Sequence, residues 1–552
     1  MKLLFKYSFA ICIIFASCRQ QVEYDVIIRN GTIYDGSGEA PITGDVAISG
    51  DSITAVGNLE RAKGRIEVDV NELAVAPGFI NMLSWANISL LEDGRSQGDI
   101  RQGVTLEVLG EGSSMGPLTE DMRKEMLEGQ SDIKFEIPWT TLGQYLQYLE
   151  DKGVSTNVAS FVGNGTLREY VIGYQNREAT EDEIKQMQQL VRQAMEEGAV
   201  GISSSLLYAP SGYADTDELI ALSTVAAEYD GMYISHIRNE GSGLLDAIDE
   251  LITICKEADL SSEIYHLKAS GMENWALLDQ AIAKVDSARE SGLPVTADIY
   301  TYPASSTGLH VQLPDWVREG GVSATIERLK DPGLKSKALK EIQFEHSPNL
   351  ILLVGFKNED LRKHIGKRLD EVAAELGKTP AEAMVDLIVE DDSRIQVVYF
   401  SMSEENIKKK VAIPWVSFCS DAGSFTNEGV FLKQSTHPRA YGSFARVIGK
   451  YVREEGVITL QEAIRKLTSL PAGNLKLKKR GMLAPGYFAD IVVFDPENVK
   501  DLATFEEPHQ YAEGVIHVFV NGIQVLQDGN HTGAMPGRFV KGPGYRSPGS
   551  DF

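Results

Sequence analysis

Two histidines lie at the ends of neighbouring apolar segments in the middle of the chain. They are His236 in "YISHIRNEG" and His266 in "IYHLKAS". A single histidine in a strand is usually a core residue that packs and hydrogen-bonds there. Two imidazoles at equivalent ends of successive strands instead converge on one point, an arrangement that suits zinc. The pair therefore indicates a metal site, with two buried core histidines as the alternative.

Two carboxylates also close apolar segments. Asp421 in "FCSDAG" ends a segment late in the chain, and Glu111 in "EVLGEGSSMG" ends an early one. An acid beside Ser420 can be simple turn chemistry, and a loop glutamate is often only exposed. Together with the two histidines, however, Asp421 is placed to deprotonate a water molecule, and Glu111 offers a carboxylate that can bind zinc.

Alternating strands and helices must position these side chains. The strand candidates are "VAPGFINML", "TLEVLG", "NVASFVG", "AVGISSS", "MYISHIR", "EIYHLKAS", "VTADIYTY" and "VSFCSDAG", and many precede amphipathic segments such as "DEIKQMQQLVRQAMEEG". This pattern predicts an α/β protein with a (β/α)8 TIM barrel over residues 76–479, whose reactive groups lie where strands end. The stretch over about 305–410 is too long for a loop and predicts an inserted subdomain.

Both ends of the chain have a different texture. Residues 23–75 and 480–535 consist of short β-branched runs separated by turns, several of them marked by Asn-Gly or Asp-Gly dipeptides. Two β-rich ends around a long middle are expected to pair into one small composite β-sandwich.

The N-terminus predicts export. Lys2 and Lys6 precede the apolar run "YSFAICIIFA", which is too short to span a bilayer and is typical of a signal peptide over residues 1–17. The small residues before Cys18 resemble a bacterial lipobox, so we expect lipidation at Cys18. The expected location is the bacterial cell envelope, as a periplasm-facing lipoprotein held by its lipid anchor only, with plain secretion as the alternative. Cys255 and Cys419 lie in apolar surroundings and are expected to be buried free thiols.

Charge excludes one class of partner. The 552-residue chain carries a formal net charge of −26, and such a surface repels a phosphate backbone. Nucleic acid is therefore not expected as a partner, and a small molecule is.

The motifs together carry a family resemblance that runs from about Tyr24 to the C-terminal tail. They include "VAPGFIN", "RQGVTLEVLGEG", "GAVGISSSLLYAPSGYADTDELIAL", "YISHIRNEG", "YHLKASG", "DIYTYPASSTGL", "FCSDAG", "HPRAYGSFARVIGKYVRE" and "LTSLPAGNLKLKKRGMLAPGYFADIVVFDP". The chain resembles the N-acyl-D-amino-acid deacylases, or D-aminoacylases, of the amidohydrolase superfamily.

That resemblance implies roles for individual residues. His236 and His266 would be zinc ligands, and Asp421 would be the general base that later protonates the leaving amine. Lys268, Tyr300 and Arg439 fall where the family binds the substrate's carboxylate. The implied activity is zinc-dependent hydrolysis of the amide bond of N-acyl-D-amino acids or related D-residue peptides.

Two departures from the family pattern bear on the metal. The family's first strand ends in His-x-His, where this chain has "NMLSWAN", and the family's second-strand cysteine is replaced by Gly112. Met82, Leu83 and Trp85 are interpreted as an apolar wall that favours an apolar acyl chain. Glu111 could restore a third ligand for a single zinc per chain, which requires a local twist or bulge at the strand end.

The same departures leave an alternative function open. A lipid-anchored binding protein that kept the barrel and pocket but lost hydrolysis would also lack the cysteine and the first-strand histidines. The retained histidines and Asp421 favour the enzyme.

Overall fold

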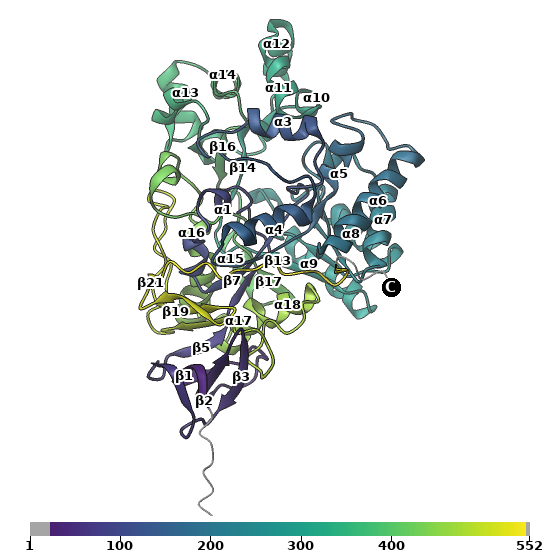
Figure 1. The fold of residues 1–552 in the computed structure, drawn as a ribbon. Helices are drawn as coiled ribbons and strands as arrows, with labels where there is room; N and C mark the ends of the chain where they lie inside the picture. The colour runs from purple at the N-terminus through teal and green to yellow at the C-terminus, as the bar shows by residue number, and fades with distance from the viewer. Residues whose placement is uncertain (1–22, 548–552) are drawn as a thin grey trace, which may run out of the picture.

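The structure is a computed structural model that describes residues 23–547 (Figure 1). The predicted signal peptide and Cys18 lie outside the described residues. Within residues 23–547, no helix is both long enough and apolar enough to cross a membrane.

Strands from both ends of the chain join in one nine-stranded sheet, at the bottom of Figure 1. The sheet order is β21-β20-β19-β18-β5-β1-β2-β3, and β4 pairs with β1. Its connection between the two chain ends is the antiparallel pair β5 and β18, in which Val75 is opposite Val493. The strands are β1 (Glu23–Ile33), β2 (Ile42–Ser49), β3 (Ser52–Gly57), β4 (Lys63–Asp69), β5 (Ala74–Pro77), β18 (Ile491–Phe494), β19 (Val515–Val520), β20 (Ile523–Gln527) and β21 (Asn530–His531).

Parallel strands form the centre of the molecule. They lie in two hydrogen-bonded groups, β6-β7-β8 and β9-β10-β11-β12-β13-β17. Met82 N donates to Phe418 O at 3.3 Å, and Ser84 bridges to Ala422, so the first strand also meets the last. The strands are β6 (Phe79–Asn81), β7 (Val104–Leu109), β8 (Asn157–Ser160), β9 (Val162–Gly163), β10 (Gly201–Ser205), β11 (Met232–His236), β12 (Ser262–Ile264), β13 (Val295–Ile299) and β17 (Val416–Phe418). This closed parallel arrangement is that of a TIM barrel.

Helices between the strands pack their apolar faces on the barrel. In α6, Thr180 and Glu183 form a capping box, and Met187, Val191 and Met195 recur at helical spacing and are buried. The helices of this layer are α1 (Ser89–Glu92), α2 (Gln97–Ile100), α3 (Glu120–Glu128), α4 (Leu142–Lys152), α5 (Asn164–Val171), α6 (Glu181–Glu197), α7 (Thr216–Ala227), α8 (Leu244–Glu257), α9 (Leu277–Glu290), α15 (Glu404–Ala412), α16 (Arg439–Arg446), α17 (Leu460–Leu467) and α18 (Ser469–Asn474).

The part of the chain from β14 to β16 builds a unit of its own, at the top of Figure 1. A three-stranded antiparallel sheet in the order β14-β16-β15 packs with helices around a separate core that includes Leu353, Met384 and Tyr399. Its elements are β14 (Ser305–Gly308), α10 (Asp315–Arg318), α11 (Gly321–Lys330), α12 (Pro332–Glu341), β15 (Ile351–Gly355), α13 (Leu369–Leu376), α14 (Pro380–Asp391) and β16 (Gln396–Tyr399).

The two cysteines within the described residues are as expected from their apolar surroundings. Cys255 and Cys419 are both free and buried, and the Cys255 thiol donates to Leu260 O.

Candidate metal centre

Three side chains from different strand ends meet at one point. Glu111 follows β7, His236 ends β11 and His266 follows β12. Glu111 Oε1 lies 3.1 Å from His236 Nδ1 and 2.9 Å from His266 Nε2. All three residues are buried, and one ligand atom from each falls within 4.8 Å of the others. The structure thus brings together the three predicted ligands.

The backbone around Glu111 explains how its side chain reaches the histidines. Gly110 and Gly112 flank it with φ of +99° and +63°, a conformation that glycine adopts without steric cost. A Cβ at Gly112 would lie 2.3 Å from the Cβ of Ser205, so only glycine fits there. The two glycines supply the local twist that this ligand needs.

The electrostatics of the cluster favour a cation. Burial alone would raise the pKa of Glu111, but His266 and His236 hold it well below its ordinary value. Burial and Lys268 would lower the pKa of His266, yet Asp421, Glu240 and Glu111 raise it to about 10. Two imidazole nitrogens and one carboxylate in an electronegative pocket are a donor set that fits a zinc-type ion with a position left open.

Asp421 follows β17 in the left-handed region, with φ of +49°. Its Oδ2 lies 2.7 Å from Arg439 Nη1, and its Oδ1 accepts a hydrogen bond of 3.2 Å from Trp85 Nε1. Burial raises the pKa of Asp421 above its ordinary value, against the opposing effect of Arg439. A raised pKa makes a carboxylate a stronger base, which suits proton transfer.

The sequence predicts that Met82, Leu83 and Trp85 form one apolar wall, but in the structure these residues have different surroundings. Met82 and Leu83 are fully buried and belong to the barrel core. Trp85 alone is partly exposed, and its indole contacts the carboxylate of Asp421. The sequence predicts only an apolar surface for Trp85 and gives no sign of this contact, which joins residues 336 positions apart.

The three residues expected to bind a substrate carboxylate also lie together. The Arg439 guanidinium lies over the Tyr300 ring at 4.5 Å, and Lys268 Nζ is 5.9 Å from the centre of the same ring. Both cations already face carboxylates, Arg439 facing Asp421 and Lys268 facing Glu240. Any anion that binds here joins an existing charge network.

Glu240 is a site residue that the sequence did not single out. Its Oε1 lies 2.5 Å from Lys268 Nζ and 3.1 Å from His266 Nδ1, and its Oε2 lies 3.7 Å from His236 Nε2. The available signal was its position four residues after His236 in "YISHIRNEG".

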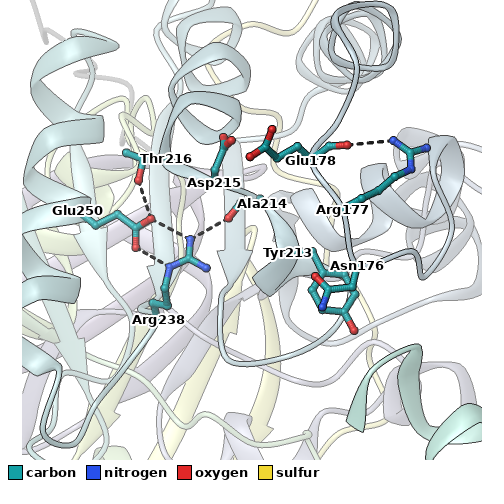
Figure 2. Close-up of a pocket in the computed structure, with 9 residues that line it drawn as sticks. All are labelled: Asn176, Arg177, Glu178, Tyr213, Ala214, Asp215, Thr216, Arg238 and Glu250. Atoms are coloured by element: carbon teal, nitrogen blue, oxygen red, sulfur yellow. Dashed lines mark hydrogen bonds and ion pairs between the residues drawn. The ribbon is translucent and has the colours of Figure 1, made fainter. Parts of the chain in front are cut away.

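A separate surface cavity of about 810 Å³ lies between the segment before α6, the start of α7, the loop after β11 and α8, and it shares no lining residue with this cluster. One of its lining cations, Arg238, donates to both carboxylate oxygens of Glu250 and to the carbonyl of Ala214 (Figure 2). Arg238 also donates to the carbonyl of Gly212. The hydrogen bonds of Arg238 are therefore used to hold the loop after β11. The cavity is not the proposed reaction site.

A parallel barrel that presents histidines and carboxylates at its strand ends is the architecture of the metal-dependent amidohydrolases. A family model described as "Amidohydrolase family" matches residues 434–526. The chain is 33% identical over 521 residues to D-aminoacylase of Alcaligenes xylosoxydans xylosoxydans, covering 94% of this chain and 97% of the relative. The chain therefore belongs to the D-aminoacylase family, which confirms the predicted resemblance.

Solved structures agree with that assignment. A D-aminoacylase described as having a binuclear centre, with one-metal activation and second-metal attenuation, matches with a TM-score of 0.78 and 32% identity. N-acyl-D-glutamate deacylase from Bordetella bronchiseptica, complexed with zinc and a phosphonate mimic of the tetrahedral intermediate, matches with a TM-score of 0.78 and 30% identity. Each match covers 94% of this chain and 100% of the other, so the predicted fold class is also confirmed.

Proposed function

We propose that this protein is a zinc-dependent hydrolase that cleaves the amide bond of N-acyl-D-amino acids or related D-residue peptides. The observation that carries the proposal is the convergence of Glu111, His236 and His266 within 4.8 Å. Asp421 and the two cations around Tyr300 complete a site that can bind an anionic amide and move a proton.

Glu111, His236 and His266 would hold one metal ion per chain. A metal in that position supplies Lewis-acid activation of a carbonyl and of water. A single ion is also consistent with the first strand, because Leu83 is core and Trp85 is engaged with Asp421. The one-metal activation described for a related D-aminoacylase supports this count.

Asp421 transfers the proton in the reaction, and Arg439 and Lys268 bind the substrate. Asp421 accepts the proton of the attacking water as the carbon–oxygen bond forms, and returns it to the nitrogen as the carbon–nitrogen bond breaks. The proton that remains on the new carboxylic acid passes to the amine, so the products are a carboxylate and an ammonium ion and the proton count balances. Arg439 and Lys268 bind the carboxylate of the amino-acid part and orient the amide toward Asp421.

The test is elemental analysis of the purified protein together with a panel of N-acyl-D-amino acids and their L counterparts. We expect bound zinc and hydrolysis of the D substrates. Asp421→Asn should lower kcat by roughly 10²- to 10⁴-fold, the usual contribution of a general base, with zinc retained. Asp528→Asn, an exposed change in a β-turn, is the matched control. Absence of both metal and turnover after zinc addition would overturn the proposal.

The same variant also tests the alternative of an inactive binding protein. If that alternative holds, wild-type protein binds N-acyl-D-amino acids without hydrolysing them. Neither the wild type nor Asp421→Asn then has a measurable hydrolytic rate. A hydrolytic rate that disappears in Asp421→Asn excludes it.

We also propose that the protein is anchored in the bacterial cell envelope through a lipid on Cys18 and faces the periplasm. The support is the signal-type sequence before Cys18. We expect wild-type protein in the membrane fraction of a bacterial expression host and Cys18→Ala protein in the soluble fraction. An unchanged distribution would contradict the anchor and favour plain secretion.

A further inference from the structure

We propose that Glu240 is a positioning residue that orients both histidine ligands and thereby sets the zinc affinity of the site. The inference rests on the proposed function, because it assumes that Glu111, His236 and His266 bind zinc. Glu240 is not one of the three proposed zinc ligands, and the family resemblance gives it no role.

The geometry places Glu240 behind both rings. His236 Nδ1 and His266 Nε2 face Glu111, and the opposite nitrogens, His236 Nε2 and His266 Nδ1, face Glu240 at 3.7 Å and 3.1 Å. One carboxylate thus spans the outer sides of two imidazoles whose centres are 4.6 Å apart and whose planes are nearly perpendicular. His236 Nε2 is buried and has no hydrogen-bond partner among the described residues, and Glu240 Oε2 faces it at 3.7 Å.

This arrangement has a direct chemical consequence for metal binding. A histidine that ligates through one nitrogen must carry its proton on the other, and a carboxylate beside that nitrogen stabilises this tautomer and fixes the ring orientation. Glu240 can do so for both ligands at once. Lys268 Nζ lies 2.7 Å from His266 Nδ1, but an ammonium group only donates, so Glu240 is the acceptor when that nitrogen carries the proton.

The loop after β11 holds Glu240 in place. Arg238 pins the loop to Glu250 on α8, and Asn239 Oδ1 accepts hydrogen bonds from the backbone of Gly241 and Gly243. The Glu240 carbonyl in turn accepts a 2.8 Å hydrogen bond from Ser270 N, in the loop that follows His266. The carboxylate is therefore fixed from both histidine-bearing segments, as a positioning group must be.

Charge balance allows a carboxylate at this depth. The Glu240 side chain is only 14% exposed, and the ammonium of Lys268 compensates its charge at 2.5 Å.

The experiment measures the zinc dissociation constant by competition with a chelator. We expect Glu240→Gln to raise that constant by roughly 10- to 100-fold, the usual effect of losing an outer carboxylate partner of a histidine ligand. Cobalt-substituted Glu240→Gln should also show an altered visible absorption band, because the ligand geometry changes. Glu240→Asp keeps the charge beside Lys268 but is too short to reach both rings. It should give a smaller increase, and it carries the test if the glutamine variant does not fold.

Two controls separate the role of Glu240 from general disruption. Glu263→Gln changes another buried carboxylate of the barrel, on β12, which accepts hydrogen bonds from Thr296, Asn474 and Ser417, and it should leave zinc affinity unchanged. Lys268→Met removes the ion pair but leaves both histidine contacts of Glu240, and it should raise KM far more than the zinc dissociation constant.

The possible results test the proposed function and the role of Glu240 separately. Wild-type protein that binds no zinc would overturn the proposed function. Wild-type protein that binds zinc, with Glu240→Gln binding it within twofold as tightly, would overturn only the role of Glu240. Equal weakening in Lys268→Met would also overturn that role, because the ion pair and not the orientation of the histidines would then control affinity.

Discussion

At the scale of single residues, Asp421 is held from two sides, by the Trp85 indole and the Arg439 guanidinium. We expect Trp85→Phe to lower kcat by about tenfold, because a hydrogen bond to a charged group contributes roughly 1.5–3 kcal/mol and here it orients the base. Zinc content and KM should change little. The measurement is steady-state kinetics with parallel metal analysis.

Trp415→Phe is the matched control for this prediction. Its indole also donates to an aspartate, Asp286, at 2.8 Å, but in another part of the barrel. Loss of zinc in Trp85→Phe, or an equal loss of rate in Trp415→Phe, would contradict the orienting role of Trp85.

Candidate metal ligands can be recognised in the sequence by their residue type and their position after an apolar segment. Contacts between side chains that lie far apart in the sequence cannot. His236 and His266 can be recognised because each ends an apolar run. Trp85 and Asp421 are separated by 336 positions, so no local pattern indicates their hydrogen bond. The role of Glu240 cannot be predicted from the sequence, because its contacts depend on how the loop after β11 folds back over the strand ends.

At the scale of elements, the turn after β7 decides what the third ligand can be. We expect Glu111→Ala to weaken zinc binding on the order of 100-fold, because two imidazoles alone hold zinc poorly. Adding Gly112→Cys, which places a cysteine where the family has one, should not restore it. The new Cβ would meet Ser205, and φ of +63° costs a non-glycine residue about 1–2 kcal/mol.

Zinc titration and urea unfolding of the single and double variants check this prediction. The double variant should bind zinc no better than Glu111→Ala and should also be less stable. Tight zinc binding restored by Gly112→Cys would show that the turn can accommodate the family's cysteine, contrary to its packing against Ser205.

At the scale of the whole molecule, the alternation of strands and helices was enough to predict the barrel, and the β-branched runs at both ends were enough to predict strands there. The order of the nine-stranded sheet and its register were not predictable, because β5 and β18 are joined by contacts across more than four hundred residues. The bend that turns Glu111 inward depends on the backbone angles of two glycines, which sequence spacing does not specify.

The barrel also buries carboxylates that play no part in the proposed chemistry, and these should make its stability depend on pH. Glu107 on β7 is fully buried and accepts hydrogen bonds from Ser84 and Thr156. Burial, and secondly the neighbouring Asp99, raise the pKa of Glu107 to about 8. Between the ordinary glutamate value and about pH 8 the folded state therefore binds more protons than the unfolded state, so this group's contribution to stability is lost as pH rises.

Glu107→Gln imitates the protonated side chain and removes that dependence. We expect the free energy of unfolding of Glu107→Gln, relative to wild type, to increase between pH 5 and pH 8. The limiting slope is about 1.4 kcal/mol per pH unit for one group. Urea unfolding at the two pH values measures the difference, with the exposed Glu497→Gln as control. A difference that stays constant or decreases with pH would mean that Glu107 is ionised in the folded barrel.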